Sequence, residues 1–301
     1  MAEERERPRC GYVAVVGRPN VGKSTLINAI LGEKVTIISP RAQTTRHRIL
    51  GVKTTPLGQA IYVDTPGLHL GGKRAMNRYL NRAASAAVRD VDLVIVVVEA
   101  LRWTDEDDYV LDVVREADVP ALLAVNKVDR VKDKGALLPF LDSTATKYHF
   151  EAILPVSAKT GINLVELEHE VLERLPESPY LFPEGQITDR DARFRAAEII
   201  REKLTLRLGQ EVPHALTVEI GTLAEREDRV MHIDAVIWVE REGQKRIVIG
   251  KGGQVLKEVG TRARREMEAV LGRKIFLQLW VKVKEGWSDD ERALRGFGYN
   301  E

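Results

Sequence analysis

The segment GRPNVGKS, Gly17 to Ser24, combines residue types and spacing that suit the binding of a phosphate chain: a glycine, four residues, and then Gly-Lys-Ser. Glycine lets the backbone turn its N–H groups toward a phosphate, and a helix starting here would add the positive end of its dipole. Lys23 is expected to reach the β and γ phosphates, and the Ser24 hydroxyl to ligate Mg²⁺. A turn that merely connects a strand to a helix is the alternative. The strand-like run YVAVV before the loop and the helical run after it favour the phosphate loop.

Two short polar segments each follow an apolar run, where the carboxyl ends of parallel strands would bring them near that loop. The first is DTPG, Asp64 to Gly67. Its aspartate can hold Mg²⁺ through a water molecule, and the Gly67 N–H can sense the γ phosphate. An Asp-Thr-Pro-Gly segment alone usually forms only a turn between two elements. Its position after a phosphate loop in the sequence is what makes it informative.

The second segment is NKVD, Asn126 to Asp129, and it has the chemistry to select guanine. Guanine offers two adjacent donors, N1–H and the exocyclic amine, and one carboxylate, that of Asp129, can accept both. A base without these donors leaves the carboxylate unpaired, a penalty of about 1–3 kcal/mol. The Lys127 stem can cover the base, and Asn126 can brace the loops. The segment at Ser157 and Ala158 can present a backbone N–H to the guanine carbonyl.

The elements around these segments alternate between apolar strands and amphipathic helices. Strands are expected at 12–16, 60–64, 93–98, 121–125 and 152–156, and helices at 74–88, 105–117 and 163–175. Thr104 and Asn163 are placed to cap the last two helices. The alternation predicts an α/β fold with a doubly wound, mostly parallel sheet, whose ligands bind beyond the carboxyl ends of the strands.

Length and composition exclude several classes of protein. The chain has 301 residues, enough for two domains, and its formal net charge of +1 does not by itself indicate a nucleic acid partner. Cys10 is the only cysteine, which excludes a disulfide framework and is typical of a reducing compartment. The charged N-terminal segment lacks the apolar core of a signal peptide. The longest apolar run, LVIVVV, is too short to span a membrane. We therefore expect a soluble, cytoplasmic protein.

A proline-rich stretch at 176–186 interrupts both the helix pattern and the strand pattern and is typical of a linker. Beyond it we expect a helix capped by Asp189, two strands at 214–220 and 230–240 joined by a hairpin, two helices separated by a glycine loop, and a last strand at 275–283. The last strand alternates, with one face formed by Ile275, Leu277, Leu279, Val281 and Val283. Trp238 and Trp280 are expected in a core.

The glycine loop is GKGG, Gly250 to Gly253, and it has the Gly-x-x-Gly form by which KH domains clamp about four nucleotides of single-stranded RNA. Glycine allows the close approach of a sugar-phosphate backbone, and Lys251 adds a positive charge. Between Lys245 and Lys274, nine basic residues stand against three acidic ones. The order helix, two strands, two helices, strand is similar to the type II KH arrangement.

Together with QTTR, Gln43 to Arg46, these motifs resemble those of the Era-like GTPases of the translation-factor class. The resemblance covers nearly the whole chain. The domains are then expected as an N-terminal tail at 1–10, a P-loop GTPase domain at 11–177, a linker at 178–188, an α+β type II KH domain at 189–285, and a C-terminal tail at 286–301. Whether the tail, which contains Trp287, packs on the surface or becomes ordered only with a partner stays open.

The expected site residues form three sets. Those expected to bind GTP are Gly17, Arg18, Pro19, Asn20, Val21, Gly22, Lys23, Ser24, Thr25, Asp64, Gly67, Asn126, Lys127, Asp129, Ser157, Ala158 and Lys159. Mg²⁺ is expected on Ser24, Thr45 and, through water, Asp64, with Thr44 as the alternative to Thr45. The RNA-binding set is Ile249, Gly250, Lys251, Gly252, Gly253, Lys257, Arg262 and Arg265.

Hydrolysis is expected to depart from the Ras pattern, in which a glutamine after the Asp-x-x-Gly segment orients the attacking water. Leu68 stands at that position and cannot hydrogen-bond water, so a slow intrinsic rate is expected. By the resemblance, Asn20 helps to bind a monovalent cation, K⁺, in the role of an arginine finger. A simple turn residue is the alternative. The expected catalytic residues are Lys23, Asn20 and Thr45.

The resemblance implies a Mg-dependent GTPase that acts in the assembly and maturation of the 30S ribosomal subunit, as a monomer, with its KH domain on a single strand near the 3′ end of 16S rRNA. GTP and Mg²⁺ are expected to order residues 43–46 and 67–72 and so to change how the KH surface is presented. Three alternatives stay open: an RNA-binding scaffold in which hydrolysis is incidental, a switch that contacts anionic lipid at the inner face of the cell membrane, and another nucleotide preference.

Overall fold

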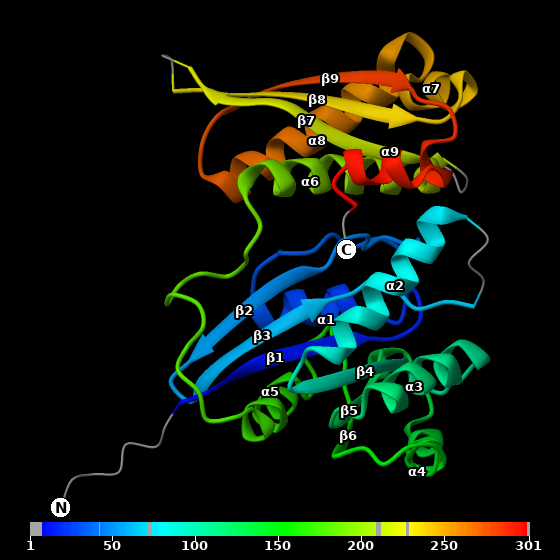
Figure 1. Ribbon diagram of the computed structural model, residues 1–301, viewed down its shortest axis with the longest axis vertical. Helices are drawn as coiled ribbons and strands as arrows, with labels where there is room; N and C mark the ends of the chain where they lie inside the picture. The colour runs from blue at the N-terminus through cyan, green and yellow to red at the C-terminus, as the bar shows by residue number, and fades with distance from the viewer. Residues whose placement is uncertain (1–7, 42, 71–73, 209–211, 227–228, 300–301) are drawn as a thin grey trace, which may run out of the picture. The chain divides into compact units, whose positions relative to one another are not determined.

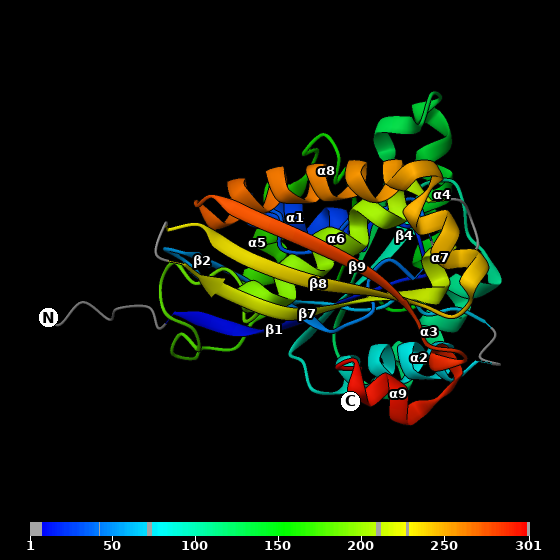
Figure 2. The same ribbon diagram turned by 90° about the horizontal axis from the view of Figure 1, so that it is seen from above.

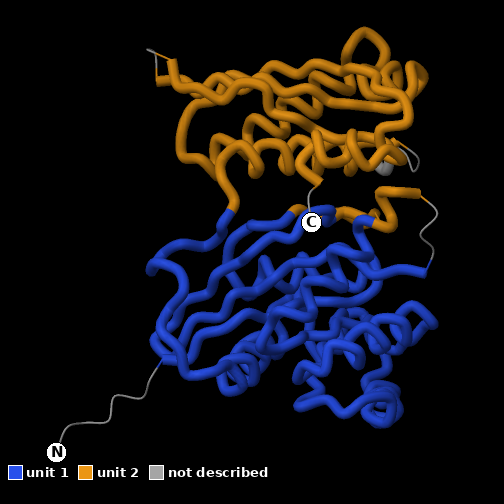
Figure 3. The backbone as a smooth tube through the Cα atoms, viewed as in Figure 1, with its two compact units in different colours: residues 1–36, 45–72, 79–189 blue, residues 37–44, 73–78, 190–301 orange. Residues whose placement is uncertain are grey.

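The chain forms two compact units, which Figure 3 distinguishes by colour. The first comprises residues 1–36, 45–72 and 79–189, and the second comprises residues 37–44, 73–78 and 190–301. The computed structural model describes residues 8–41, 43–70, 74–208, 212–226 and 229–299. Within these ranges, none of the helices combines the length and the apolar character that a membrane crossing requires.

The first unit is built on a six-stranded sheet with the strand order β2-β3-β1-β4-β5-β6. The strands are β1 (Arg9–Val16), β2 (Ile49–Thr55), β3 (Gly58–Asp64), β4 (Leu93–Glu99), β5 (Ala121–Asn126) and β6 (Ala152–Pro155). All neighbours run parallel except β2 and β3, which pair antiparallel. The expected mostly parallel, doubly wound sheet is therefore confirmed. The edge strand β2 had no predicted range.

Helices cover both faces of this sheet, as Figure 1 shows. They are α1 (Lys23–Leu31), α2 (Ala75–Arg89), α3 (Asp105–Ala117), α4 (Leu137–Ala145) and α5 (Leu164–Arg174). Apolar residues of α1 and α5 join one buried cluster, and those of α2, α3 and α4 join the other. Because successive strand residues point to opposite faces, Val13 and Val15 of β1 enter the first cluster and Ala14 and Val16 the second.

The strand register brings the carboxyl ends of the strands together. Val15 of β1 pairs with Asp64 of β3, and Glu99 of β4 pairs with Asn126 of β5. The phosphate loop begins directly after β1. Segments that are far apart in the sequence therefore meet at one edge of the sheet, where a doubly wound fold binds its ligands.

The second unit contains a three-stranded sheet with the order β7-β8-β9. Its elements are α6 (Ala192–Arg207), β7 (Leu216–Glu225), β8 (Met231–Val239), α7 (Glu242–Ile249), α8 (Gln254–Leu271) and β9 (Ile275–Val283). β7 and β8 pair antiparallel, whereas β8 and β9 pair parallel. Buried residues of α6 and α8 pack with inward residues of all three strands. The expected order of elements is confirmed, and Figure 2 shows β8 and β9 with α6 behind them.

Two details of this unit differ from the sequence-based expectation. The N-cap of α6 is Asp191, whose side chain accepts a hydrogen bond from the Phe194 N–H at 2.8 Å, and Asp189 was the wrong choice. Neither tryptophan expected in the core lies there: Trp238 is half-buried on the face of β8 opposite to Ile237, and 58% of Trp280 is exposed. Trp280 occupies the face of β9 opposite to Leu279, because strand side chains alternate between faces.

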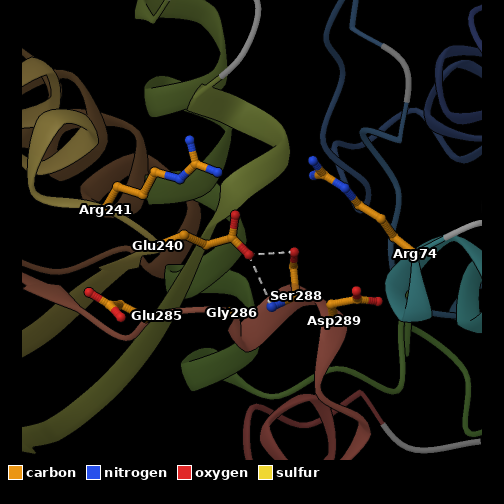
Figure 4. A pocket seen from close by; sticks show the side chains of 7 residues that line it. All are labelled: Arg74, Glu240, Arg241, Glu285, Gly286, Ser288 and Asp289. Carbon is orange, nitrogen blue, oxygen red and sulfur yellow. Dashed lines mark hydrogen bonds between the residues drawn. The ribbon is translucent and has the colours of Figure 1, made fainter.

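The C-terminal segment is folded as far as the structure describes it. Trp287 is fully buried and packs edge-to-face against Phe297, with ring centroids 5.4 Å apart. A short helix, α9 (Glu291–Gly296), follows and is capped by Asp290. Glu240 accepts hydrogen bonds from the Ser288 N–H and hydroxyl beside a hollow of about 470 Å³, drawn in Figure 4. Acidic and basic side chains both line this hollow, so it favours neither anions nor cations.

Candidate nucleotide and RNA sites

The phosphate loop lies between β1 and α1 and needs glycine at two points of close contact. Gly22 has φ of +107°, and a Cβ there would lie 2.3 Å from Asn126 Nδ2. A Cβ at Gly17 would lie 2.4 Å from the Val97 carbonyl oxygen. Lys23 Nζ donates to the carbonyl oxygens of Gly17 at 2.9 Å and Arg18 at 3.0 Å. Burial lowers the pKa of Lys23 to about 8, and a phosphate beside it would favour the charged form.

Three oxygen-bearing side chains converge beside this lysine. The Ser24 hydroxyl donates to Asp64 Oδ2 at 2.8 Å, and the Thr45 hydroxyl donates to the same oxygen at 3.2 Å. The Thr44 hydroxyl points elsewhere and donates to the Arg41 carbonyl oxygen at 2.6 Å. Of the two adjacent threonines, Thr45 is therefore the one that lies with the carboxylate.

The Asp64 carboxylate has the character of a ligand for a hard cation. Its Oδ1 atom is buried and accepts no hydrogen bond. Burial raises the pKa of Asp64 to about 6, against the opposing effect of the hydrogen bond from Ser24. A divalent cation beside it would favour the ionised carboxylate, and hydroxyl and carboxylate oxygens are the ligands that Mg²⁺ prefers. The residues present therefore fit Mg²⁺.

The NKVD segment joins three loops. Asn126 Nδ2 donates to the Val21 carbonyl oxygen at 2.9 Å, and its Oδ1 accepts from the Ala158 N–H at 3.0 Å. Asn126 is buried, so it braces the phosphate loop against the loop after β6. The Ser157 hydroxyl donates to Asp129 Oδ1 at 2.7 Å, which orients the carboxylate from one side. Asp129 itself is exposed and free to face a ligand.

An ion network beneath these loops was missed by the sequence analysis. Arg18 is nearly buried, and its guanidinium lies 3.1 Å from Asp107 Oδ2 and 3.3 Å from Glu99 Oε2. The other oxygen of Glu99 lies 3.2 Å from Lys127 Nζ. Glu99 thus links the phosphate loop to the NKVD segment. Its position at the carboxyl end of β4 was the only signal in the sequence that could have pointed to it.

The other expected nucleotide residues lie around the same edge of the first unit. Thr25 is in the first turn of α1, Lys159 is exposed after Ala158, and Gly67 approaches Pro19, whose backbone nitrogen would lie 2.9 Å from an added Cβ. Asn20 is exposed, with φ of +64°. Leu68 is fully buried and presents no polar group to water.

The GKGG loop joins α7 to α8 in the second unit. Gly250 has φ of +74°, and a Cβ there would lie 2.4 Å from Val255 Cγ2. Gly252 and Gly253 also have positive φ, and no atom lies within 4 Å of a Cβ built on either. The loop backbone is therefore tightly packed at Gly250 and open at the next two glycines. An open glycine backbone before a helix N-terminus suits the close approach of a phosphate.

A hollow of about 400 Å³ continues from this loop along α8 and β9. Its lining includes Gly253 and Lys257 of the expected RNA set. The expected RNA-binding set did not include the other lining residues, which are Leu256, Gly260, Thr261, Arg264, Leu277 and Leu279. A glycine inside a helical pattern was the available signal, since a Cβ at Gly260 would lie 3.3 Å from Leu279.

Six expected RNA-binding residues lie outside that lining set, among them Gly250 and Gly252 of the loop itself. Lys251 is exposed on the loop, Ile249 is half-buried at the end of α7, and Arg265 is exposed on α8. Arg262 pairs with Glu258 one turn earlier on α8. Arg264 is the arginine of this stretch that lines the hollow.

Comparison with known proteins identifies both kinds of domain. The family model described as "50S ribosome-binding GTPase" matches residues 12–127, and the model described as "KH domain" matches residues 211–288. GTPase Era of Pseudomonas aeruginosa is 56% identical over 97% of this chain and 96% of the relative. GTPase Era of Stenotrophomonas maltophilia is 55% identical over 98% of this chain and 99% of the relative. The chain belongs to the GTPase Era family.

Solved Era structures share the whole fold. An Aquifex aeolicus Era variant bound to GDP and aluminium fluoride aligns with a TM-score of 0.94 at 40% identity, covering 97% of this chain and all of that one. Era in complex with MgGDPNP and nucleotides 1506–1542 of 16S ribosomal RNA aligns with a TM-score of 0.95 at 40% identity, covering 98% of this chain. Era membership confirms the expected GTPase activity and the KH domain.

Proposed function

We propose that this chain is a Mg-dependent GTPase switch that binds 16S rRNA through its KH domain and acts in the assembly and maturation of the 30S ribosomal subunit. The observation that carries the catalytic half is the convergence of Ser24, Thr45 and Asp64 beside Lys23, at the mouth of a phosphate loop. The solved Era complex with MgGDPNP and a 16S rRNA fragment supports the choice of ligands.

In this proposal, Ser24 and Thr45 hold Mg²⁺ directly, and Asp64 holds it through water. The ion neutralises negative charge on the phosphates when it is bound. Lys23 leaves the carbonyl oxygens of Gly17 and Arg18 and turns toward the β and γ phosphates. Because these two backbone acceptors lie within the loop itself, the exchange needs only a rotation of the lysine side chain.

Guanine is read by the loops that Asn126 holds together. Asp129 accepts from N1–H and the exocyclic amine, while the Ser157 hydroxyl fixes one carboxylate oxygen. The stem of Lys127 covers the base, and its ammonium group is held by Glu99. The exposed Lys159 and the backbone at Ala158 complete the edge of the site. A base that lacks the two donors leaves Asp129 unpaired and is rejected.

Hydrolysis is slow in this proposal because Leu68 cannot orient water, and Asn20 contributes to a K⁺ site that compensates charge on the phosphates. The exposure of Asn20 and its left-handed backbone support a group that faces the bound nucleotide. Single-turnover hydrolysis in KCl and in NaCl tests this role. We expect faster turnover in KCl, and a smaller salt difference in Asn20→Ala. Equal hydrolysis rates in the two salts would contradict the proposed role of K⁺.

RNA is held by the GKGG loop and the hollow along α8 and β9. Lys257 and Arg264 supply positive charge, and Leu277 and Leu279 supply an apolar wall for bases. The strand bound is a pyrimidine-containing single strand near the 3′ end of 16S rRNA. Crosslinking in cells followed by sequencing of the bound RNA tests this, and recovery of no 16S sequence would contradict it.

Nucleotide state and RNA binding are coupled in this proposal through residues 37–44. This segment precedes Thr45 in the sequence and belongs to the second unit. There, the Ile38 N–H donates to Glu202 Oε1 at 3.0 Å, and Arg201 of α6 donates to the Thr44 carbonyl oxygen. A change at Thr45 is thus one peptide bond from a contact with α6. RNA affinity measured with a GTP analogue and with GDP tests the coupling, and identical values would remove it.

Single-turnover hydrolysis with and without 30S subunits separates an enzyme from a scaffold in which hydrolysis is incidental. We expect 30S subunits to raise the rate of GTP hydrolysis. This increase should be absent in the double variant Lys251→Asp with Gly252→Asp. We propose a cytoplasmic monomer. Sedimentation with anionic vesicles tests a peripheral membrane contact, and retention in the supernatant is the expected result.

A further inference from the structure

The edge strand β9 presents two different faces. Its inward residues Leu277 and Leu279 line the hollow along α8. The residues between them point the other way, and Phe276 and Trp280 are 46% and 58% exposed. Gln278 and Lys282 share that outer face and are also exposed. One strand therefore contributes both to the expected RNA groove and to the opposite surface of the sheet.

The outer face continues onto β8, where one aromatic pair and one cation–π pair join the two strands. His232 lies beside Phe276 in the register, with ring centroids 4.8 Å apart. Trp238 lies beside Lys282, whose ammonium nitrogen is 5.7 Å from a ring centroid of the indole. Figure 2 shows no helix in front of β8 and β9 among the described elements of this unit. The Phe276 and Trp280 rings are exposed, whereas Trp238 packs against Phe297 of the C-terminal segment, with ring centroids 5.8 Å apart.

The charges on this face are mixed overall, but β9 itself is free of acidic residues. Lys282 is followed by Lys284, whose ammonium nitrogen lies over the Phe297 ring at 4.7 Å. The acidic residues of the face are Asp234 of β8 and Glu219 of β7. Glu219 accepts a hydrogen bond from Trp238 Nε1 at 2.7 Å. The side of the face nearest to the groove therefore carries rings, an amide and cations.

Exposed rings on a rigid strand, next to an amide and ammonium groups, suit unpaired nucleobases. Every base has a π-face that can stack on an aromatic ring, and cations along the path attract the phosphates. The groove and the outer face share β9, so a strand of RNA that passes over this edge contacts both. The two lysines would contribute less to the binding of a protein partner, because most protein surfaces do not offer a regular row of negative charges as the RNA backbone does.

We propose that Trp280 and Phe276 form a second subsite for single-stranded RNA, on which bases beyond those held in the groove stack. The subsite rests on the proposed RNA binding of the KH domain and extends it to a longer strand. Trp280 is the principal stacking platform, and Lys282 with Lys284 contacts the phosphates. RNA short enough to fit within the groove does not reach this subsite.

The test compares two RNAs from the 3′ end of 16S rRNA, one of about six nucleotides that fills the groove and one of about fourteen that contains it. Fluorescence anisotropy gives the affinity of the full chain for each. We expect Trp280→Ala to weaken binding of the longer RNA roughly 5- to 100-fold and to leave the shorter one unchanged. Trp280→Phe keeps most of the affinity for the longer RNA.

The matched control is Leu206→Ala, which removes an exposed apolar side chain from α6 in the same unit. It should change neither affinity. Equal losses on both RNAs, or no loss on the longer one, would overturn the subsite, as would Trp280→Ala dissolving a self-association seen in sedimentation. If the wild-type chain binds neither RNA, the proposed RNA binding fails first and the subsite falls with it.

Discussion

Glu99 Oε1 lies 3.2 Å from Lys127 Nζ, so the last residue of β4 holds the lysine of the NKVD segment in place. The same carboxylate contacts Arg18 of the phosphate loop through its other oxygen, at 3.3 Å. The phosphate loop and the NKVD segment, which we propose to contact opposite ends of a nucleotide, thus share one acidic anchor. Such an anchor restricts both loops before the nucleotide arrives, which reduces the ordering that binding must otherwise impose.

Replacing this anchor should weaken the binding of GDP and GTP alike. Glu99→Gln keeps the shape but removes the charge, and it leaves Arg18 paired only with Asp107. We expect nucleotide dissociation to be about 5- to 30-fold faster, with little change in the hydrolysis rate of bound GTP. Stopped-flow release of a fluorescent GDP measures this. Asp112→Asn, which breaks an exposed pair with Arg115, is the control, and a similar effect there would refute the anchor.

The same variant should show a defined pH dependence of stability. Burial raises the pKa of Glu99, but the hydrogen bonds and charges of Lys127 and Arg18 outweigh it and hold the pKa below its ordinary value. A carboxylate with a lowered pKa stabilises the folded state above its unfolded pKa of about 4.3, and this contribution is lost as the pH falls further. Urea unfolding should therefore separate wild type from Glu99→Gln at pH 7 and bring them together once the pH falls below the lowered folded pKa of Glu99.

Asp129→Asn should change which base is bound. The amide presents a donor where the carboxylate accepted, so it pairs poorly with guanine and better with xanthine, which carries a carbonyl in place of the exocyclic amine. We expect affinity for GDP to fall by at least about 10-fold and affinity for XDP to rise. Competition between the two nucleotides measures the ratio. An unchanged preference would undo the assignment of the base site.

Two glycines of the GKGG loop should respond differently to substitution. Gly252→Asp combined with Lys251→Asp places negative charge where no protein atom lies within 4 Å of a Cβ at residue 252. Asp tolerates left-handed backbone, so the unit should stay folded and lose RNA binding while GTP binding persists. Gly250→Ala instead forces a Cβ to within 2.4 Å of Val255 and should lower the melting temperature. Intact RNA capture by the double variant would contradict the RNA site.

Two tryptophans of the second unit should differ in their contribution to stability. Trp287 is fully buried between Phe297 and Tyr299, so Trp287→Ala should cost about 3–5 kcal/mol of unfolding free energy. Trp280→Ala removes a ring that is mostly exposed and should cost less than about 1 kcal/mol. Guanidinium unfolding of the full chain measures both. Equal losses would mean that the C-terminal segment does not pack as described.

Prediction was most specific where the pattern lies in contiguous residues. The phosphate loop, DTPG, NKVD and GKGG each combine a backbone shape with the side chains that use it, so the spacing carries the information. The strands of the first unit were found because burial on both faces makes them continuous apolar runs. Strand β2 was not given a range, because it lies at the edge and is apolar only in part.

Two expectations failed where the local sequence offered competing choices. Asp189 and Asp191 are both acidic residues that precede the helix, so the sequence did not distinguish them. Only the backbone geometry shows that Asp191 caps α6. The core position expected for Trp280 conflicted with the alternation of β9, in which Leu277 and Leu279 already occupy the covered face. An aromatic residue in a strand was a weaker guide than the period of two.

The sequence by itself indicated a phosphate loop, a segment with the chemistry to select guanine and a glycine loop of KH type, and it predicted a mostly parallel sheet in the first unit. Only the tertiary structure decided that Thr45 and not Thr44 lies against Asp64, that Glu99 joins Arg18 to Lys127, and that Trp280 faces outward. The physical reason is the distance along the chain over which each interaction acts. Motifs and periodicity are set by neighbours along the chain, whereas hydroxyl direction, ion pairing and the exposure of a strand face depend on which distant elements pack beside them.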